Sequence, residues 1–547
     1  MNKIEQLVKD KIVVVIKDLY DYDAQSDVHL EIPKDNSFGD YSSNVAMRLS
    51  KKLGMAPRVL AEALQKALGE DVSLFSEVSI AGPGFINFRI AQHHFGDVIN
   101  TIIKEKDDYG RNTTGNNIKV NVEYVSANPT GDLHPGHARG AATGDALTRI
   151  MKFSGYDVTR EFYLNDAGVQ IDMMARSLQA RYLELFNLDV TFPEEGYKGQ
   201  DIIDIAVQLK AEVNDAYVDE DMDKHILAFR AYGLEAETEK LKRDLALFRV
   251  EFDVWSKESD IYAQNKVETA LNKVKDSGYT YEEDGALWLQ TTAFGDDKDR
   301  VLVKSDKNYT YLTPDIAYHQ DKFDRGYDRL INLFGADHHG YINRLKASMQ
   351  ILGYDKDQLD VEIIQMALMF KDGEEFKMSK RTGKSISLRE LILETDVDAL
   401  RYLYVDRAPD SPMTIDLDLA LQKTNENPVY YAQYAHARMN SILVQGEKYE
   451  VANSFELINH EKEVELIKHL NEFTNVVSDA AKSQLPNKIS NYISRLANLF
   501  HSFYGANKVL DESNVVLTEQ RLGLVLAAKI VLKNALNLIG VSAPDSM

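Results

Sequence analysis

Apolar and polar residues alternate along several short segments of the chain, and this period of two predicts half-buried strands. Phe85–Ile90 and 118–124 alternate in this way. Short apolar runs between polar segments predict four further strands, at 158–164, 301–304, 329–334 and 361–370. Helical or irregular segments separate these strands, so we expect a mostly parallel sheet.

A helix is predicted over 137–153, after the strand at 118–124 and a loop at 126–133. A strand, a glycine-containing loop and a helix in this order open a Rossmann-type unit. Between about 195 and 285 a Glu/Lys-rich stretch predicts a helical insertion. From Leu388 to the end we expect helices and no strand.

The length of the chain bounds its organisation. Its 547 residues are too many for one core, because domains usually contain about 100–200 residues. We predict an α/β fold of three domains: an α+β N-terminal domain (1–113), a Rossmann-type parallel-sheet domain with the insertion (114–390), and an all-α C-terminal bundle (391–547).

Composition removes several classes of protein. Hydrophobic residues make up 44% of the chain and charged residues 27%, as in globular proteins, and there is no cysteine for disulfides, thiol nucleophiles or cysteine-bound zinc. The net charge of −23 argues against diffuse binding to nucleic acid, so RNA would need local basic or aromatic surfaces. The apolar run at 13–16 is too short for a signal peptide and no run is long enough to span a membrane, so we expect a cytosolic location.

The sequence His134-Pro-Gly136-His137 follows the predicted strand at 118–124 and begins the predicted helix. Gly136 allows close approach of a ligand, and the free N–H groups and dipole of a helix N-terminus favour phosphate. His134 and His137 can donate hydrogen bonds to phosphate oxygens as charge builds on them. Histidines that only cap a helix are the alternative; zinc is disfavoured because no further ligands are suggested nearby.

A second motif, Lys377-Met378-Ser379-Lys380, follows a predicted strand and is followed by Arg381. A loop with three cations can close over a pyrophosphate leaving group and neutralise its charge in the transition state. For this motif alone, a solvated basic loop is the alternative.

The two motifs together narrow the chemistry. HxGH at the first strand-to-helix crossover, followed about 240 residues later by KMSK, is the arrangement of the class I aminoacyl-tRNA synthetases. The chain resembles this class, with HPGH in place of its HIGH and KMSKR in place of its KMSKS. The resemblance implies that ATP is used to activate an amino acid as an adenylate.

Further segments resemble the bacterial arginyl members of this class. They are 122–131, 294–300, 309–319, 335–340 and the tetrapeptide Asp398-Ala-Leu-Arg401, after which the family's anticodon-binding domain is named. The resemblance implies ligation of L-arginine to the 3′ end of its tRNA through an arginyl-adenylate, with ATP bound to Mg²⁺ and no structural metal. It also implies a monomer whose N-terminal domain contacts the outer corner of the tRNA.

Recognition of arginine calls for carboxylates, because a guanidinium is a planar fork of hydrogen-bond donors. Glu123, at the end of a strand, and Asp315, at the start of a helix, could face one crevice. In the family, the positions of Tyr311 and Asp315 contact the guanidinium, and those of Glu123, Asn128 and His134 also line the substrate pocket. Each carboxylate taken alone could instead be a surface group or a helix cap.

The ATP site should lie at the same crevice. We expect it to include His134, His137, Lys377 and Lys380, together with Asp337 and His338 at another strand-to-turn junction. A carboxylate at that junction can accept hydrogen bonds from ribose hydroxyls. Asn165 and Asp166 end the strand at 158–164 and either join this site or form a turn.

Two acid-free segments near the C-terminus predict the RNA-binding surface. Residues 480–510 contain basic but no acidic residues, and 427–438 contains tyrosines and a histidine that can stack on splayed bases. The alternative is that Tyr430 and Tyr434 form one packed helix face. By the resemblance this bundle binds the anticodon, and we predict contacts from Tyr430, Tyr434, Arg438, Arg495 and Met547.

Three other functions fit parts of this pattern. A silent RNA-binding paralogue would be expected to lack a HIGH histidine or a KMSK lysine, and a small-molecule nucleotidylyltransferase would not need so large a C-terminal helical region. A class I synthetase for another amino acid is disfavoured, because the modest insertions leave no clear room for a large editing domain and the cysteine-zinc types are excluded by composition.

Lys380→Ala should slow adenylate formation far more than it weakens arginine binding, since a lysine that neutralises departing pyrophosphate acts in the transition state. We expect the rate of activation to fall by about 10²–10³, equivalent to about 3–4 kcal/mol. Single-turnover kinetics against the unchanged protein measures this step, and an unaltered rate would contradict the assignment.

Overall fold

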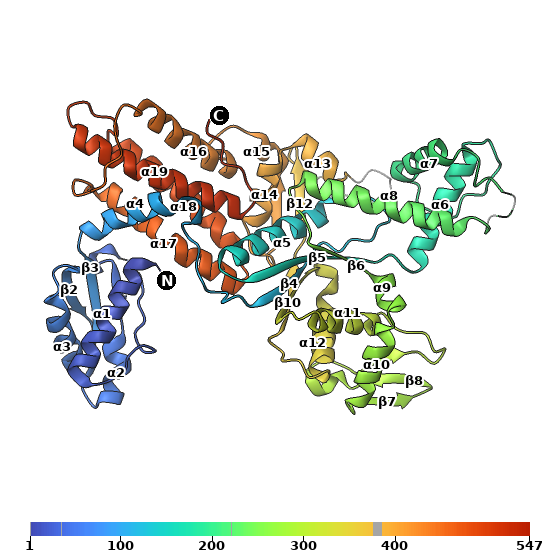
Figure 1. The fold of residues 1–547 in the computed structure, drawn as a ribbon, viewed down its shortest axis with the longest axis horizontal. Coiled ribbons are helices and arrows are strands. Elements are labelled where there is room, and N and C mark those ends of the chain that lie inside the picture. Colours follow the sequence, from blue (N-terminus) through green and yellow to red (C-terminus); the bar gives the residue numbers. More distant parts are fainter. Residues whose placement is uncertain (1, 34, 220, 222, 376–385) are drawn as a thin grey trace.

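The computed structural model describes residues 2–547 except 34, 220, 222 and 376–385, so the predicted motif Lys377-Met378-Ser379-Lys380 lies outside the described residues. Figure 1 shows a parallel sheet near the centre, with the orange and red C-terminal helices on one side and a green helical arm on the other. Across the described part of the chain, no helix combines the length and the apolar character that crossing a membrane requires.

The N-terminal lobe is an α+β unit, as predicted. Both of its outer strands pair in antiparallel fashion with β3, which is the predicted strand Phe85–Ile90. Its elements are α1 (Lys3–Tyr20), β1 (Tyr41–Ser43), α2 (Val45–Leu53), α3 (Pro57–Gly69), β2 (Phe75–Ala81), β3 and, leading out of the lobe, α4 (His93–Glu105).

The centre of the molecule is a five-stranded parallel sheet in the order β11-β10-β4-β5-β6. Its strands are β4 (Lys119–Glu123), β5 (Asp157–Leu164), β6 (Val254–Lys257), β10 (Arg329–Gly335) and β11 (Leu359–Ile364). The chain runs from β4 through α5 (Pro135–Phe153) to β5, whereas β10 lies on the other side of β4. The strand order therefore reverses at β4, and ligands bind beside such a reversal at the carboxyl ends of the strands.

The predicted strands at 158–164 and 329–334 are confirmed, but two others do not join the sheet as expected. The segment 301–304 forms β9, which pairs with β8 in a separate antiparallel sheet with β7. The segment 361–370 divides into β11 and β12, which lie in different sheets. The bounds are β7 (Thr280–Glu283), β8 (Ala286–Leu289), β9 (Arg300–Val303) and β12 (Ala367–Lys371).

The stretch 195–285 is helical only in part. It contains α7 (Gln200–Val213) and α8 (Ile226–Leu247), which pack with α6 (Val169–Glu184) to form a helical arm beside the sheet (Figure 1). It also contains β6, which is an edge strand of the central sheet. This strand was missed because it is only four residues long and none of them is fully buried, so its pattern is weak.

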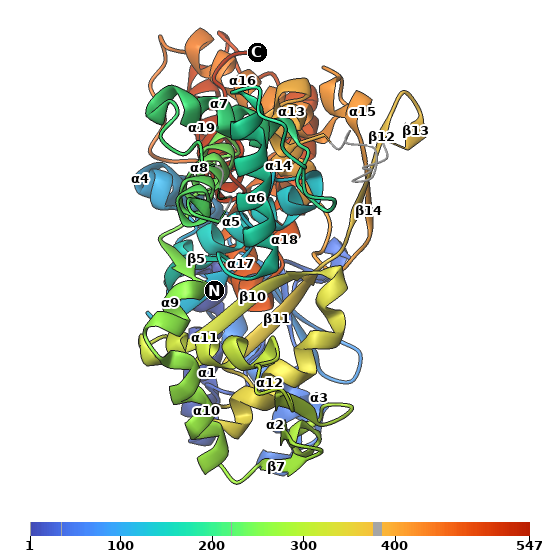
Figure 2. The same cartoon turned by 90° about the vertical axis from the view of Figure 1, so that its right-hand side faces the viewer.

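The prediction of helices alone after Leu388 is wrong at β14 (Met413–Asp416), which pairs in parallel with β12. Its residues Met413-Thr414-Ile415-Asp416 alternate between apolar and polar, but four residues are too few to distinguish a strand from the helices around it. Figure 2 shows β12 and β14 running together along one side of the molecule. The other elements of the region are β13 (Glu374–Glu375), α13 (Leu388–Glu394), α14 (Val397–Val405) and α15 (Leu417–Leu421).

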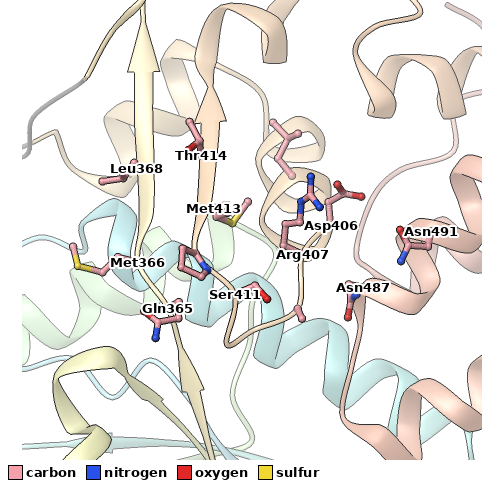
Figure 3. A pocket seen from close by; sticks show the side chains of 13 residues that line it. Gln365, Met366, Leu368, Asp406, Arg407, Ser411, Met413, Thr414, Asn487 and Asn491 are labelled. Carbon is pink, nitrogen blue, oxygen red and sulfur yellow. The ribbon is translucent and has the colours of Figure 1, made fainter.

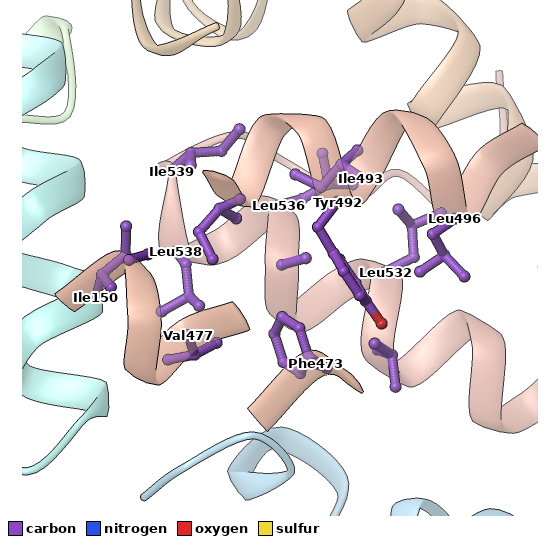
Figure 4. Close-up of a cluster of buried hydrophobic side chains, with 14 of the residues drawn as sticks. Ile150, Phe473, Val477, Tyr492, Ile493, Leu496, Leu532, Leu536, Leu538 and Ile539 are labelled. Atoms are coloured by element: carbon purple, nitrogen blue, oxygen red, sulfur yellow. The ribbon is translucent and has the colours of Figure 1, made fainter. Parts of the chain in front are cut away.

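The C-terminal bundle consists of α16 (Pro428–Gln445), α17 (Glu461–Ser483), α18 (Asn487–Ala506) and α19 (Val515–Leu538). Its core is continuous with that of the central sheet. Figure 4 shows Ile150 of α5 in one cluster with Val477, Leu538 and Ile539 of the bundle region, and all four side chains are buried. The bundle is therefore packed directly on the first crossover helix.

A buried arginine fastens this junction. The guanidinium of Arg401 on α14 pairs with Asp145 of α5 and donates to the carbonyls of Phe248 (2.9 Å) and Ile539 (3.2 Å). Gly540 leaves room for it, because a Cβ at that residue would lie 2.1 Å from the arginine. The tetrapeptide that contains Arg401 thus joins the sheet, the end of the helical arm and the C-terminus.

Removing Arg401 should destabilise the protein far more than removing Arg149, although both pair with Asp145. The Arg401 side chain is 0% exposed, and losing one partner of a buried ion pair costs about 3–5 kcal/mol. Arg149 is 39% exposed, and such a pair contributes about 0–1 kcal/mol. Urea denaturation of Arg401→Leu and Arg149→Leu measures the difference; equal midpoints would show that the junction is not stabilised by this arginine.

Candidate active site

The HPGH motif follows β4 at the start of α5, as predicted: His134 is the N-cap, and Pro135, Gly136 and His137 form the first turn of the helix. Nδ1 of His134 accepts a hydrogen bond from the N–H of Gly136 (3.0 Å), and Nδ1 of His137 accepts one from the N–H of His134 (3.2 Å). The two rings stack with centroids 3.8 Å apart. Because Nδ1 is an acceptor in each neutral ring, the hydrogen is on Nε2, where it can be donated to a phosphate oxygen. Helix capping and phosphate binding are thus compatible.

The described chain after residue 385 resumes next to this loop. The N–H of Leu388, the first residue of α13, donates to the carbonyl of Leu133 at 2.6 Å. Ser387 and Glu390 form a capping box at this helix start. The chain that follows the KMSK motif therefore begins beside the HPGH loop.

Asp315 lies on the first turn of α11 (Leu312–Asp324), where it is half-buried and accepts a hydrogen bond from the Tyr341 hydroxyl. Burial raises the pKa of Asp315 to about 7 in spite of that hydrogen bond, and the negative charges of Glu123 and Glu258 add to the increase. At neutral pH the Asp315 carboxyl is therefore only partly ionised, and a cation bound beside it would favour its charged form.

Glu258 is a second carboxylate close enough to raise the pKa of Asp315, and sequence analysis did not indicate it. It begins α9 (Glu258–Ala263), directly after β6, and the Tyr163 hydroxyl hydrogen-bonds to it. Burial raises the pKa of Glu258 as well. Within the described residues, neither Asp315 nor Glu258 forms an ion pair. Its position directly after a strand could have marked Glu258 as a site residue, but the strand, β6, was not predicted from the sequence.

Glu123 is buried at the end of β4, but it is not an unpaired carboxylate. One oxygen pairs with Nζ of Lys322 at 2.5 Å, and the other accepts a hydrogen bond from Ser126 (2.9 Å). Lys322 is fully buried and also donates to Asn332 (3.3 Å). Within the described part of the chain, the buried charge of Glu123 is therefore already neutralised by a buried partner, unlike that of Asp315.

The other predicted arginine contacts lie further out. Tyr311 is 87% exposed, so its side chain is not packed beside Asp315. Asn128 is exposed and donates to Gln170 of α6 at 2.8 Å. The structure thus gathers Glu123 and Asp315 at the carboxyl ends of the strands and leaves Tyr311 at the surface.

Asp337 and His338 follow β10 in a short 3₁₀ helix (Ala336–Tyr341), beside the reversal of strand order. Their side chains are exposed, and the His338 ring lies 3.8 Å from the Asp337 carboxylate. Asp166 instead caps α9, because it accepts hydrogen bonds from the N–H (2.9 Å) and hydroxyl (2.6 Å) of Ser259. Both carboxylate oxygens of Asp166 therefore contact the start of α9.

A network that sequence analysis did not identify fixes α11 to the sheet. Glu161 of β5 is fully buried and accepts hydrogen bonds from Arg325 (2.9 Å to each oxygen), Tyr318 (2.8 Å) and Ser256 (2.6 Å). Burial alone would raise the pKa of Glu161, but the positive charges of Lys322 and Arg325 lower it to about 2. Asp315 is therefore carried by a helix whose position is fixed by ion pairs.

A hollow of about 860 Å³ lies away from this crevice, between β12, β14 and the start of α18 (Figure 3). Behind it Arg139 of α5 is buried and donates to the carbonyls of Gln365 (2.6 Å), Ala408 (2.9 Å) and Ser411 (2.9 Å). None of the lining residues belongs to the predicted site. Arg139 links the HPGH helix to both sides of the hollow.

Of the predicted RNA contacts, Tyr430, Tyr434 and Arg438 lie on α16, Arg495 lies on α18, and Met547 follows the last helix. Tyr430 and Tyr434 are half-buried with parallel rings 6.2 Å apart, and the ring of Tyr434 stacks on His501 at 5.8 Å. Arg438 donates to the Tyr504 hydroxyl (2.9 Å). Arg495 and Met547 are exposed. The alternative that Tyr430 and Tyr434 form one packed helix face holds only in part, because part of each side chain is accessible to solvent.

Family models match three parts of the chain. They are the arginyl tRNA synthetase N terminal domain (4–90), the tRNA synthetases class I (R) catalytic domain (98–444) and the DALR anticodon binding domain (432–547).

Whole-chain comparisons agree with these matches. Arginine–tRNA ligase 1 of Halalkalibacterium halodurans and the arginine–tRNA ligase of Geobacillus kaustophilus are each 49% identical to the chain, with 100% of both sequences covered. The solved Thermus thermophilus arginyl-tRNA synthetase shares the fold, with a TM-score of 0.77 at 20% identity over 99% of this chain and 100% of that one. The chain therefore belongs to the class I arginyl-tRNA synthetase family.

Proposed function

We propose that this ATP-dependent arginine–tRNA ligase forms arginyl-adenylate in the crevice at the carboxyl ends of β4 and β10. One observation carries the proposal: Asp315 and Glu258 are half-buried carboxylates with no ion pair in the part of the chain that the structure describes. Two such acceptors suit a guanidinium, whose planar donors can bind both. A neutral analogue would leave them unpaired and be rejected.

In the proposed reaction, the carboxylate of arginine attacks the α-phosphorus of ATP, which enters with Mg²⁺ as part of the substrate. A bond from the carboxylate oxygen to phosphorus forms as the bond to pyrophosphate breaks. Nε2 of His134 and of His137 donates to phosphate oxygens at the N-terminus of α5, where the helix dipole also favours negative charge. Lys377 and Lys380 neutralise the departing pyrophosphate.

Transfer to tRNA follows when the 2′-hydroxyl of the terminal ribose attacks the mixed anhydride and releases AMP. We assign the anticodon contacts to the surface formed by Tyr430, Tyr434, Arg438, Arg495 and Met547. Exposed tyrosine faces beside arginines suit unstacked bases. The family resemblance also supports a cytosolic monomer whose N-terminal lobe contacts the outer corner of the tRNA.

Pyrophosphate exchange tests the proposed function. Purified protein should exchange labelled pyrophosphate into ATP with arginine and not with other amino acids, and we expect exchange to require arginine tRNA, as the family resemblance implies. Exchange with a different amino acid would indicate another synthetase. Absence of exchange under all conditions would indicate a catalytically silent RNA-binding protein.

Arginine binding should weaken as the pH falls below about 7. The guanidinium is always charged, whereas Asp315 has a raised pKa of about 7 and is neutral below it, so arginine must bind to the ionised form. Affinity should therefore fall by up to about tenfold for each pH unit below that value. Calorimetric titration of the protein with arginine at pH 6, 7 and 8 measures the effect.

Two variants serve as controls for the titration of the protein with arginine. Asp315→Asn should bind arginine weakly at every pH, because it removes the group that titrates. Asp324→Asn, on the same helix but 57% exposed, should keep the pH dependence of the unchanged protein. An affinity that is independent of pH in the unchanged protein would contradict the role of Asp315.

A further inference from the structure

The loop that precedes the HPGH motif is held by three elements from outside the central sheet. Asn128 contacts Gln170 at the start of the helical arm, and Leu133 contacts the N-terminus of α13. Between these points, Asp132 pairs with Lys240 of α8 at 3.1 Å. Two of the three contacts therefore come from the helical arm.

Lys240 is the centre of a cluster of carboxylates. Its ammonium lies 2.7 Å from Glu237 on the same helix, 3.1 Å from Asp201 on α7 and 3.1 Å from Asp132 in the loop. The Lys240 side chain is 13% exposed and that of Glu237 is 0% exposed. Lys240 thus neutralises charge that its neighbours could not bury alone.

Packing does not hold Asp132 in place. A hollow of about 940 Å³ lies between the helical arm and the start of α13, and Asp132, Asp201 and Lys240 all line it. Asp132 is half-exposed at its edge. Without the ammonium, repulsion between Asp132 and Asp201 would push the loop into this open space. Asp132 is two residues before His134, so any such movement reaches the HPGH motif.

We propose that the helical arm fixes the HPGH loop for catalysis and that Lys240 is its positioning residue. Lys240 contacts no reacting group; it acts through Asp132 on the placement of His134 and His137. The inference rests on the proposed role of those histidines at the phosphates of ATP. Misplacement of a catalytic group by about 1 Å can lower a rate by about 10².

Steady-state aminoacylation with varied ATP and varied arginine tests this inference. Lys240→Met should lower kcat/KM for ATP by about 10–10², while the KM for arginine changes less than about twofold because Asp315 and Glu258 are untouched. Asp132→Asn removes only the loop end of the contact and should lower kcat/KM for ATP in the same direction. Lys242→Met is the matched control: Lys242 is on the same helix, 42% exposed and paired with Glu239, and its loss should leave both parameters unchanged.

The double variant separates positioning from general stability. If Lys240 acts through Asp132, adding Asp132→Asn to Lys240→Met should lower kcat/KM for ATP no further, because the two changes break one contact. Multiplying effects, or a lower melting temperature with unaltered ATP kinetics, would overturn the inference. The proposed function is judged separately, by pyrophosphate exchange in the unchanged protein.

Discussion

A charged side chain that is buried must be neutralised. At the carboxyl ends of the strands, the ion pairs that neutralise buried carboxylates determine where the other side chains of the site lie. Glu161 is paired with Arg325 and Glu123 with Lys322, so the two most deeply buried carboxylates of the crevice already have cations. Lys322 is on α11, which also carries Asp315, and Arg325 directly follows this helix. The pairs that stabilise the fold therefore also place Asp315, the carboxylate to which we assign the substrate guanidinium.

The same constraint explains the junctions between domains. Arg139 and Arg401 are fully buried. The guanidinium of Arg139 donates to backbone carbonyls, and that of Arg401 donates to a backbone carbonyl and pairs with a buried aspartate. A planar group with five donors can bind several chain segments at once. Because both arginines contact or lie on α5, the HPGH helix is the element that the sheet, the helical arm and the bundle share.

Ion pairing within the protein also distinguishes two kinds of carboxylate at the crevice, those that have a cationic partner and those that do not. Where a cation is built in, as at Glu161, the pKa falls to about 2 and the group serves the fold. At Asp315, by contrast, burial raises the pKa to about 7, and ionisation becomes favourable when a cationic substrate arrives. In the function that we propose, the arginine substrate completes a charge balance that the protein leaves open.

Local pattern alone was enough to place β3, β4, β5, β10 and the HPGH turn, because alternation and helix-start signals extend over neighbouring residues. It could not reveal β6 or β14, since a four-residue strand with at most one buried side chain carries almost no periodic signal. For the same reason Glu258 was missed.

The sequence by itself thus determined the reaction class and the order of the domains, because motifs of adjacent residues encode both. Only the tertiary structure decided which carboxylates are paired with cations of the protein and which are left without an ion pair among the described residues. Glu123 and Lys322 are 199 residues apart, and Asp132 and Lys240 are also far apart along the chain. Neutralisation of buried charge depends on distance in space, which no local pattern records.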